Sequence, residues 1–330
     1  MDKNEILLSI IIPVYNVEKF IKVCLDSILS YESTLYETII VNDGTQDNSM
    51  SIVEQYVKQN DNRIIIINQE NQGLSNTRNN GIRKAKGKYI WFIDSDDFIE
   101  INAIDSILKE IKKKEPDVFA MPIIYNYSNG ERIADVVFRN ETITNEDYLN
   151  RKYPFGASVR FLLKRDFLLK NNLFFIPNIL HEDGEFGLRM LYYAKEIAII
   201  SKTFYNYRIQ ECGSIMSSWS EKNSIDLIYI SKLLNQLFRS NPLKINNKVF
   251  INSIFSILLS SVQFAKNKWN TTQFDVFYKK NKSKIRHEAF QVLVGSSIVV
   301  KIKLLLFIIS PFYYVKYRSR IGRLLVSVQK

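Results

Sequence analysis

Residues 89–97 read Tyr89-Ile90-Trp91-Phe92-Ile93-Asp94-Ser95-Asp96-Asp97, an apolar and aromatic run that ends in three carboxylates. Carboxylates packed this closely repel one another unless a cation lies among them. Oxygen ligands at the end of a strand suit Mg²⁺ or Mn²⁺. The alternative interpretation is an acidic turn that closes a strand, and this stretch alone does not separate the two.

Strand and helix patterns alternate over the first hundred residues. The expected strands cover 7–13, 37–42, 63–68 and 89–94, and the expected helices cover 18–29, 47–59 and 74–86. This alternation predicts an α/β fold with right-handed βαβ units and a mostly parallel central sheet. Ligands bind at the carboxyl ends of the strands in such sheets. We therefore expect the functional site at that edge.

The rest of the chain changes character twice. From about 116 to 207 it mixes short strands, expected at 118–125 and 197–205, with helices at 164–170 and 185–195. Beyond residue 220 it becomes helical, with helices expected at 224–237 and 248–264. We predict two parts, 1–217 and 218–330, although no Pro/Gly-rich linker marks the border between them.

Composition points to an ordered protein of a reducing compartment. Hydrophobic residues make up 46% of the 330 residues, which is enough for a real core. The two cysteines, Cys24 and Cys212, are too few for a disulfide framework. The two histidines, His181 and His287, offer no Cys/His cluster for zinc. The apolar run 6–14 follows two acids, so we interpret it as a buried strand and not as a secretion signal.

The net charge of +11 is concentrated at the end of the chain. Beyond residue 263 there are fourteen Lys and Arg against two acids, a net charge of +12. A nucleic-acid binder would be basic more evenly, so no nucleic-acid partner is expected. Within 296–326, the apolar runs 304–309 and 312–315 are flanked by Lys and Arg. The charge-free run 304–315 is too short to span a bilayer, which needs about 20 apolar residues.

Two interpretations of this basic, apolar end remain open. The first is a segment that lies in the interface of an anionic membrane, with apolar groups in the lipid and Lys or Arg at the headgroups. The second is a C-terminal helix that packs on the domain and turns a solvated basic face outward.

Three further polar clusters follow the apolar strands upstream. They read Ile11-Ile12-Pro13-Val14-Tyr15-Asn16, then Val41-Asn42-Asp43-Gly44-Thr45, then Asn71-Gln72-Gly73-Leu74-Ser75-Asn76-Thr77-Arg78-Asn79-Asn80-Gly81. In this order and with Asp94-Ser95-Asp96 after them, they resemble the family 2 glycosyltransferases and their nucleotide-sugar-binding (GT-A) fold. The resemblance covers about 5–217 and is strongest over the first hundred residues. It implies a nucleotide-sugar-binding half over about 1–115 and an acceptor half over about 116–217.

The side chains of these clusters suit a nucleotide. Tyr15 offers an aromatic face to a base, and Asp43 can accept from a base N–H or a ribose hydroxyl. Gly73 allows a tight turn at a helix start, and Arg78 on that helix can reach a base or a phosphate. The alternatives are a core aromatic for Tyr15, a simple turn for Asp43-Gly44 and a surface charge for Arg78.

The resemblance assigns roles residue by residue. The family's matching aspartate and arginine, here Asp43 and Arg78, contact the nucleobase. Asp96 matches the carboxylate that binds Mn²⁺ or Mg²⁺ at the diphosphate, Asp94 lies by the ribose, and Asp97 is a third candidate ligand. The expected nucleotide-sugar set is Pro13, Tyr15, Asn16, Asp43, Gly73, Arg78, Asp94, Ser95 and Arg208, and the expected metal ligands are Asp94, Asp96 and Asp97.

The stretch Ile179-Leu180-His181-Glu182-Asp183-Gly184-Glu185-Phe186 resembles the family's Glu-Asp motif, which opens a helix below the acceptor. The resemblance makes Asp183 the general base and Glu182 an orienting residue, and a single base implies inversion of configuration. A simple helix cap is the alternative. Tyr207-Arg208-Ile209 with Ser214-Ile215-Met216 resembles a mobile strand and loop, where Arg208 contacts the diphosphate or has a structural role.

The sequence thus predicts an inverting, metal-dependent hexosyl- or N-acetylhexosaminyltransferase of bacterial capsule, exopolysaccharide or cell-surface glycan type. The family implies a UDP-sugar donor and a lipid-linked saccharide or other glycan acceptor. The expected location is cytoplasmic, peripheral to the inner face of the membrane. Alternatives are a nucleotidyltransferase, although Pro13-Val14-Tyr15-Asn16 lacks a Gly-rich phosphate loop, and a non-catalytic nucleotide-binding membrane scaffold. No motif in the sequence specifies the donor sugar, the acceptor, the linkage or the oligomeric state.

Overall fold

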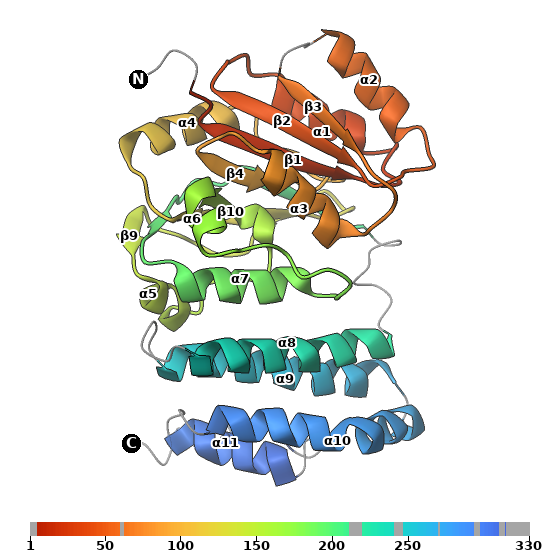
Figure 1. The fold of residues 1–330 in the computed structure, drawn as a ribbon, viewed down its shortest axis with the longest axis vertical. Helices are drawn as coiled ribbons and strands as arrows, with labels where there is room; N and C mark the ends of the chain where they lie inside the picture. The colour runs from red at the N-terminus through yellow and green to blue at the C-terminus, as the bar shows by residue number, and fades with distance from the viewer. Residues whose placement is uncertain are drawn as a thin grey trace. The chain divides into compact units, whose positions relative to one another are not determined.

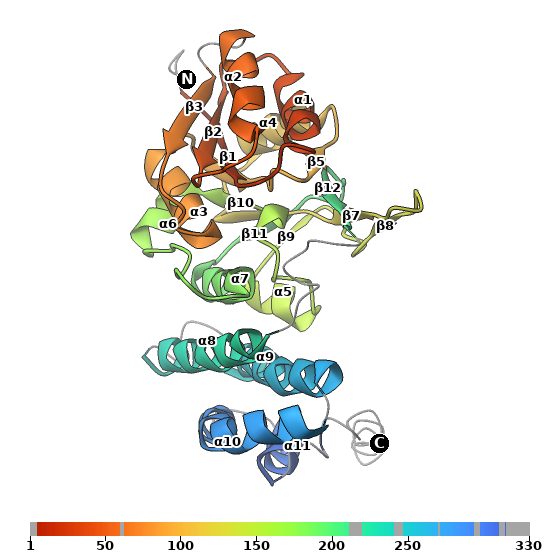
Figure 2. The same ribbon diagram turned by 90° about the vertical axis from the view of Figure 1, so that its right-hand side faces the viewer.

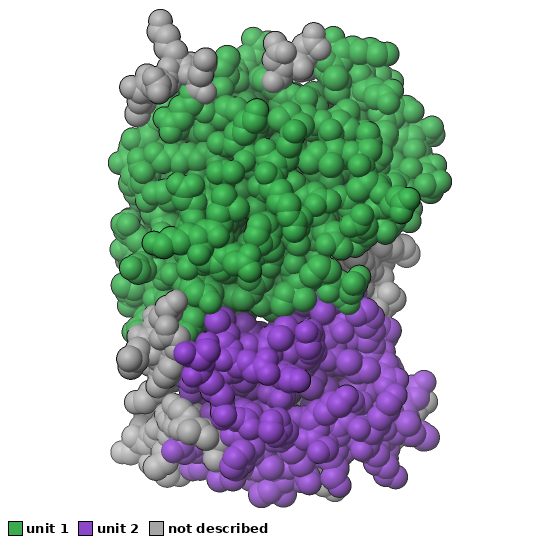
Figure 3. All heavy atoms as spheres, in the orientation of Figure 1, with its two compact units in different colours: residues 1–148, 153–178, 182–211 green, residues 149–152, 179–181, 212–330 purple. Residues whose placement is uncertain are grey.

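The computed structural model describes residues 5–59, 63–210, 220–240, 247–269, 271–293, 298–309 and 314. The chain divides into two compact units, coloured separately in Figure 3. Unit 1 comprises 1–148, 153–178 and 182–211, and unit 2 comprises 149–152, 179–181 and 212–330.

Unit 1 is built on an eight-stranded mixed sheet (Figure 1). Its strands in spatial order are β3 (Ile64–Asn68), β2 (Tyr36–Asn42), β1 (Leu8–Val14), β4 (Tyr89–Phe92), β10 (Phe161–Lys164), β6 (Val118–Ala120), β11 (Ile197–Ile199) and β9 (Glu141–Ile143). The parallel arrangement that the sequence predicts is confirmed from β3 to β4 and recurs between β6 and β11. However, β10 runs antiparallel to both of its neighbours and β9 runs antiparallel to β11, so the whole sheet is mixed.

The helices of the first hundred residues cover both faces of this sheet (Figure 2). They are α1 (Ile21–Leu29), α2 (Ser49–Gln59) and α3 (Leu74–Lys84), each within three residues of its predicted range at both ends. The chain moves from β1 to β2 to β3 in one direction and then returns to β4, and right-handed crossovers therefore place α1 and α2 on one face and α3 on the other. Because both faces are covered, every residue of β1 and β4 is buried.

Two predicted strands each divide into two. The range 118–125 forms β6 and β7 (Ile123–Asn126), and 197–205 forms β11 and the start of β12 (Tyr205–Arg208). β7 and β12 leave the large sheet for a second one, ordered β5 (Phe98–Ile99), β12, β7, β8 (Arg132–Ala134). Pro122 stands at the first break, and a proline has no N–H for a strand ladder.

Four further helices and one 3₁₀ turn follow along the chain up to residue 193. They are α4 (Ala103–Lys113), α5 (Asn145–Asn150), a short 3₁₀ turn η1 (Ser158–Arg160), α6 (Arg165–Lys170) and α7 (Glu182–Tyr193). The sequence predicts α7 from residue 185, but the helix begins at Glu182, so the Glu-Asp motif lies inside its first turn.

Unit 2 is helical over its described residues. It contains α8 (Glu221–Ser240), α9 (Asn247–Lys268), α10 (Thr271–Leu293) and α11 (Ile298–Ile309), and α8 pairs with α9 as α10 pairs with α11 (Figure 2). The two helices predicted beyond residue 220 are confirmed as α8 and α9, and α10 is an addition to the prediction. None of the helices among the described residues is long and apolar enough to cross a membrane.

Candidate active site

Three parallel strands bring the sequence clusters to one edge of the sheet. Tyr15 follows β1, Asp43 follows β2, and Asp94 follows β4, with β1 between the other two. The crossovers change face between β1 and β4, because α1 lies on one side and α3 on the other. Such a switch point opens a crevice beyond the strand ends, which is where ligands of open α/β sheets bind.

Arg78 of α3 joins two of the predicted motifs. Its side chain is only 1% exposed, and Nη2 donates to Asp94 Oδ1 at 2.8 Å. Nη1 donates to Asp183 Oδ1 at 2.8 Å and to Glu182 Oε1 at 3.3 Å. The guanidinium also lies over the ring of Phe175, 5.2 Å from its centroid. The surface-charge alternative is therefore wrong, while a contact from Arg78 to a base or phosphate stays a prediction.

The charges around Arg78 balance one another. Burial alone would lower the pKa of Arg78, but Asp183, Asp94 and Glu182 raise it above its usual value, so the guanidinium stays charged. Burial raises the pKa of both Glu182 and Asp183, and the charge of Arg78 opposes that rise. The raised pKa gives the Asp183 carboxylate a higher affinity for a proton, as a general base needs. Its hydrogen bond with Arg78 holds it in a fixed position.

The start of α7 sets the orientation of this carboxylate pair. Glu182 and Asp183 occupy the first turn, where the helix dipole favours negative charge. His181 precedes them in the left-handed region, with a φ of 63°. Its Nε2 lies 3.4 Å from Asn223 Nδ2, and burial lowers its pKa, so the imidazole is neutral near pH 7. His181 thus directly precedes the first turn of α7 and lies beside Asn223.

Asp97 braces the loop that follows β4. It is buried, and both of its oxygens accept hydrogen bonds: Oδ2 from the Tyr205 hydroxyl at 2.6 Å and Oδ1 from the Arg208 N–H at 2.7 Å. Burial, followed by the charges of Asp94 and Asp96, raises the pKa of Asp97 to about 8. Asp97 as a metal ligand stays a prediction, in which an oxygen would use the lone pair that its hydrogen bond leaves over.

Asp94 and Asp96 each keep one oxygen for another ligand. One oxygen of Asp94 accepts from Arg78, and Oδ2 of Asp96 accepts from Gln210 Nε2 at 2.8 Å. Neither second oxygen makes a hydrogen bond among the described residues. Burial and the charge of Asp94 raise the pKa of Asp96 to about 6. A cation between the two carboxylates would offset their repulsion and lower that pKa.

The protein ligands for a divalent cation are few but suitable. Within the described ranges, no group of three or more His, Cys, Asp or Glu side chains is arranged to hold a metal ion. Mg²⁺ is usually held by one or two carboxylates together with substrate phosphates, and not by a complete protein cage. The pair Asp94 and Asp96 fits that pattern, with the remaining positions left to a diphosphate and water.

The nucleotide end of the site is arranged by Asp43. Its Oδ1 accepts from Gln69 Nε2 at 2.7 Å and from the Gln72 N–H at 2.8 Å, and Oδ2 accepts from the Gly73 N–H at 2.9 Å. These bonds fix the turn into α3, where Gly73 has a φ of 81°. Asp43 thus does more than close a turn after β2, and its contact with a base stays a prediction.

The residues after β1 lie where a nucleotide could reach them. Tyr15 is 46% exposed, so the core-aromatic alternative is wrong. Asn16 donates from its N–H to Thr45 Oγ1 at 2.7 Å, which links the loop after β1 to the loop after β2. Pro13 is buried within β1, and Ser95 is buried in the loop after β4, so both support the backbone of the site.

A hollow of about 490 Å³ lies at the ends of β2 and β3. Its lining residues are Gly44, Gln46, Asn68, Gln69, Glu70 and Asn71. Gly44 has a φ of 70°, and a Cβ there would lie 3.0 Å from the backbone nitrogen of Asn71. Sequence reasoning did not single out Gln46 or Gln69, although Gln69 directly follows β3 and Gln46 lies four residues after β2, and such positions were a usable signal.

Arg208 of β12 contacts both the loop after β4 and the segment before α1. Its Nε donates to the backbone carbonyl of Asp96 at 3.0 Å, and its guanidinium lies over the rings of Phe20 and Phe98, 5.1 Å and 5.5 Å from their centroids. This is the structural role that the sequence left open, and a contact to the diphosphate stays a prediction. Ser214-Ile215-Met216 lies outside the described residues. Tyr205 and Gln210 are functional candidates that sequence reasoning missed.

Comparison with known proteins agrees with this geometry. A family model described as glycosyl transferase family 2 matches residues 9–170. Glycosyltransferase GlyG of Streptococcus pneumoniae is 32% identical over 223 residues, which cover 64% of this chain and 73% of GlyG. Glycosyltransferase GlyA of the same organism is 32% identical over 229 residues, 65% of this chain. The chain belongs to glycosyl transferase family 2.

The fold is also found in a solved structure. Staphylococcus aureus TarS 1–349 in complex with UDP-GlcNAc aligns with a TM-score of 0.72 at 20% identity, covering 96% of this chain and 92% of that one. At this identity the likeness concerns the fold, which is the mixed-sheet GT-A arrangement described above. The match with GlyA covers only 32% of that longer protein.

Proposed function

We propose that this protein is an inverting, metal-dependent glycosyltransferase that moves a sugar from a nucleotide-sugar donor to a hydroxyl of a cell-surface glycan or lipid-linked saccharide. The observation that carries the proposal is the position of Arg78 between Asp94 and the Glu182–Asp183 pair. Asp94, on the side of the proposed donor, and Asp183, the candidate base, thereby pair with the same buried guanidinium. Sugar transfer requires donor binding and a base for the acceptor at neighbouring positions.

Asp183 is the proposed general base. It accepts the proton of the acceptor hydroxyl as that oxygen attacks the anomeric carbon of the donor sugar. The bond from the anomeric carbon to the diphosphate oxygen breaks, and the nucleoside diphosphate leaves with that electron pair. One base on the face opposite the leaving group gives inversion of configuration. Glu182 and Arg78 hold the base in position.

Asp94 and Asp96 are the proposed ligands of Mn²⁺ or Mg²⁺, with the Asp97 carboxylate behind them. When bound, the cation supplies Lewis-acid stabilisation of the charge that develops on the diphosphate. The chain's own part is to keep the two carboxylates together, through the hydrogen bonds of Asp97 with Tyr205 and of Asp96 with Gln210.

A UDP-sugar is the proposed donor. Tyr15 offers an exposed ring, and the hollow beside Gly44 lies at the end of the sheet where the family binds its nucleotide. The fold relative TarS was solved with UDP-GlcNAc, and its curated name is poly(ribitol-phosphate) beta-N-acetylglucosaminyltransferase. These names support an N-acetylhexosamine or hexose donor and a cell-surface polymer or its precursor as acceptor. A cytoplasmic location beside the membrane follows from such an acceptor.

A nucleotide-sugar screen tests the proposal. With Mn²⁺ present, we expect one UDP-sugar to raise the thermal unfolding midpoint more than Mn²⁺ or the sugar nucleotide alone, because both ligands bind the folded state together. Turnover of that donor must release a nucleoside diphosphate. Formation of a nucleoside triphosphate and a sugar 1-phosphate from the donor and added pyrophosphate would instead make the protein a nucleotidyltransferase. The absence of any shift or turnover across UDP-, GDP- and dTDP-sugars would overturn the proposal.

A further inference from the structure

Helix α11 is apolar on two faces, and only one of them is packed. Leu304 and Phe307 are fully buried, and the ring of Phe307 contacts those of Phe255 and Tyr314 at centroid distances of 5.6 Å and 5.8 Å. On the other face, Leu305 is 48% exposed and Ile309 is 69% exposed. The helix is therefore held in unit 2 by one apolar face and presents a second one outward.

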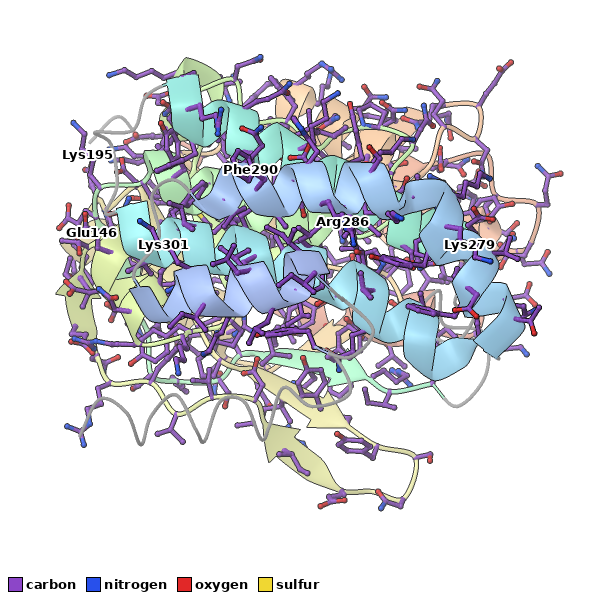
Figure 4. The ribbon with its side chains drawn as sticks, turned by 90° about the horizontal axis from the view of Figure 1, so that it is seen from below. Glu146, Lys195, Lys279, Arg286, Phe290 and Lys301 are labelled. Carbon is purple, nitrogen blue, oxygen red and sulfur yellow. The ribbon has the colours of Figure 1, made fainter. Side chains whose placement is uncertain are left out.

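Helix α10 presents a similar outward face beside it. Val276 is 63% exposed and Phe290 is 57% exposed, and Lys279 lies on the same stripe because the spacings of three and eleven residues fit helical turns. Arg286 of α10 donates to the backbone carbonyl of Ile309 at 3.1 Å, which ties the C-terminal end of α11 to α10. Figure 4 shows the two helices side by side, with Lys279, Arg286 and Phe290 labelled on α10 and Lys301 on α11.

The charged residues of this helix pair are mostly basic. The described parts of α10 and α11 carry six lysines and Arg286 against two acids. Of these acids, Glu288 is buried and accepts from Asn235, which leaves Asp275 exposed. Lys280 pairs with Glu221 at 3.3 Å, but no ion pair of Lys279 or Lys301 occurs within the described residues. An apolar stripe bordered by unpaired lysines is what an interfacial helix offers to a lipid surface.

We propose that the outward face of α10 and α11, defined by Val276, Lys279, Phe290, Lys301, Leu305 and Ile309, docks this protein onto an anionic lipid surface. A second copy of the chain would bring like charges together at this face, whereas anionic headgroups complement them. Apolar side chains enter the acyl boundary while the lysines remain at the headgroups. The inference deepens the proposed function, since it supplies a means for the enzyme to work beside a membrane-linked acceptor.

Vesicle sedimentation of the full chain tests the docking face. We expect binding to vesicles of phosphatidylglycerol and phosphatidylcholine, little binding to phosphatidylcholine alone, and weaker binding in high salt because the attraction is screened. Each basic residue near an anionic surface contributes about fivefold in affinity, so Lys279→Gln with Lys301→Gln should weaken binding roughly thirtyfold. Leu305→Gln with Ile309→Gln should weaken it at least about tenfold.

Each control variant matches a docking-face variant in its change of net charge or of hydrophobicity. Lys58→Gln with Lys112→Gln removes two exposed lysines of unit 1, and Ile101→Gln with Val137→Gln removes two exposed apolar side chains of unit 1. Both controls should bind vesicles like the wild type. Circular dichroism and donor turnover without vesicles confirm that each variant is folded.

Three results would overturn the docking proposal. They are equal binding to neutral vesicles, equal losses in the face variants and their controls, and no vesicle binding, with or without a dimer that Leu305→Gln and Ile309→Gln dissociate. Donor turnover in solution is measured on the same samples. Turnover without lipid binding refutes only the docking face, whereas lipid binding without turnover refutes the glycosyltransferase proposal and leaves the docking face standing.

Discussion

At the scale of single residues, Arg78 determines how the site is held together. A buried guanidinium with three carboxylate partners is stable only while all charges are compensated. Replacement of one partner in a buried ion network leaves the others uncompensated in a medium of low dielectric constant. The side chain therefore links the stability of unit 1 to the geometry of catalysis.

We expect Arg78→Met to lower the free energy of unfolding by about 3–5 kcal/mol, because it leaves Asp94, Glu182 and Asp183 without their cation. Urea unfolding measures the loss. Arg83→Met, on the exposed side of the same helix, should change stability by less than about 0.5 kcal/mol. Equal and small effects from both variants would show that the buried network contributes nothing to the fold.

Asp183→Asn keeps the size of the side chain but cannot take a proton. We expect turnover to fall roughly 10²–10⁴-fold with donor affinity little changed, since the loss affects a proton transfer and not binding. Steady-state kinetics with saturating donor measures the effect. Normal turnover in Asp183→Asn, together with inactivity of Glu182→Gln, would transfer the base role to Glu182.

The pH profile of the wild type should reflect the burial of Asp183. Burial raises the pKa of its carboxyl, so the group is protonated and inactive at low pH and becomes a base as the pH rises through that raised value. We expect the acid limb of kcat/KM to lie above the usual aspartate value of about 3.9 and to vanish in Asp183→Asn. A profile with its acid limb at about 3.9 would contradict the burial of the base.

The sequence predicted these residues but not their partners. Asp94, Asp183 and Arg78 were each singled out by their motifs. Their convergence could not be read from the sequence, because Arg78 and Asp183 are separated by 105 positions and nothing local encodes such a contact. The hydrogen bonds of Asp97 with Tyr205 and Arg208 could not be predicted for the same reason, since both partners lie more than a hundred positions away in the sequence.

At the scale of elements, β12 supports the loop that follows β4. The Tyr205 hydroxyl donates to Asp97 Oδ2 and accepts from the Asp94 N–H at 3.2 Å, so one side chain spans the loop. Its ring packs edge-on against Trp91 of β4. The carboxylates are thus positioned by a strand of the second sheet as well as by β4 itself.

Tyr205→Phe removes the hydroxyl and keeps the ring contact with Trp91. We expect the fold to remain and the Mn²⁺ concentration for half-maximal turnover to rise several-fold, because the loop 94–97 loses both of its hydrogen bonds with the Tyr205 hydroxyl. A Mn²⁺ titration of turnover measures the shift. Tyr207→Phe, on the same strand, is the matched control, and an unchanged Mn²⁺ requirement in Tyr205→Phe would show that the loop needs no such brace.

The helices and strands of the first hundred residues were predictable because each shows its hydrophobic pattern within its own sequence, and strands and helices alternate regularly along the chain. Mostly apolar runs mark β1, β3, β4 and the second half of β2, and α1 and α2 each have a polar and an apolar face. Helix α3 is mostly polar, and its buried side chains include Thr77, Arg78 and Asn79. The later half was harder to predict. There, runs such as 118–125 carry strand character throughout, yet tertiary pairing and Pro122 divide them between two sheets.

At the scale of the whole molecule, the two units carry different chemistry. Unit 1 contains the strand ends, the carboxylates and Arg78, and belongs to a family of glycosyltransferases. Unit 2 contains most of the excess positive charge. For the described part of α11, Leu304 and Phe307 pack inward, as the packed-helix interpretation expects, while Leu305 and Ile309 face outward. The membrane interpretation stays a prediction. Residues 296–297, 310–313 and 315–326 of that segment lie outside the described residues.

Metal-dependent transfer is the central claim, and one measurement addresses it directly. Release of the nucleoside diphosphate from the best-stabilising nucleotide sugar is followed in Mn²⁺, after complete chelation, and in Asp96→Ala with Mn²⁺ restored. We predict turnover in the first case and its loss in the other two, with circular dichroism unchanged, because the cation proposed to bind Asp94 and Asp96 is what would offset the charge on the departing diphosphate. Undiminished turnover under chelation, or in Asp96→Ala, would contradict the account.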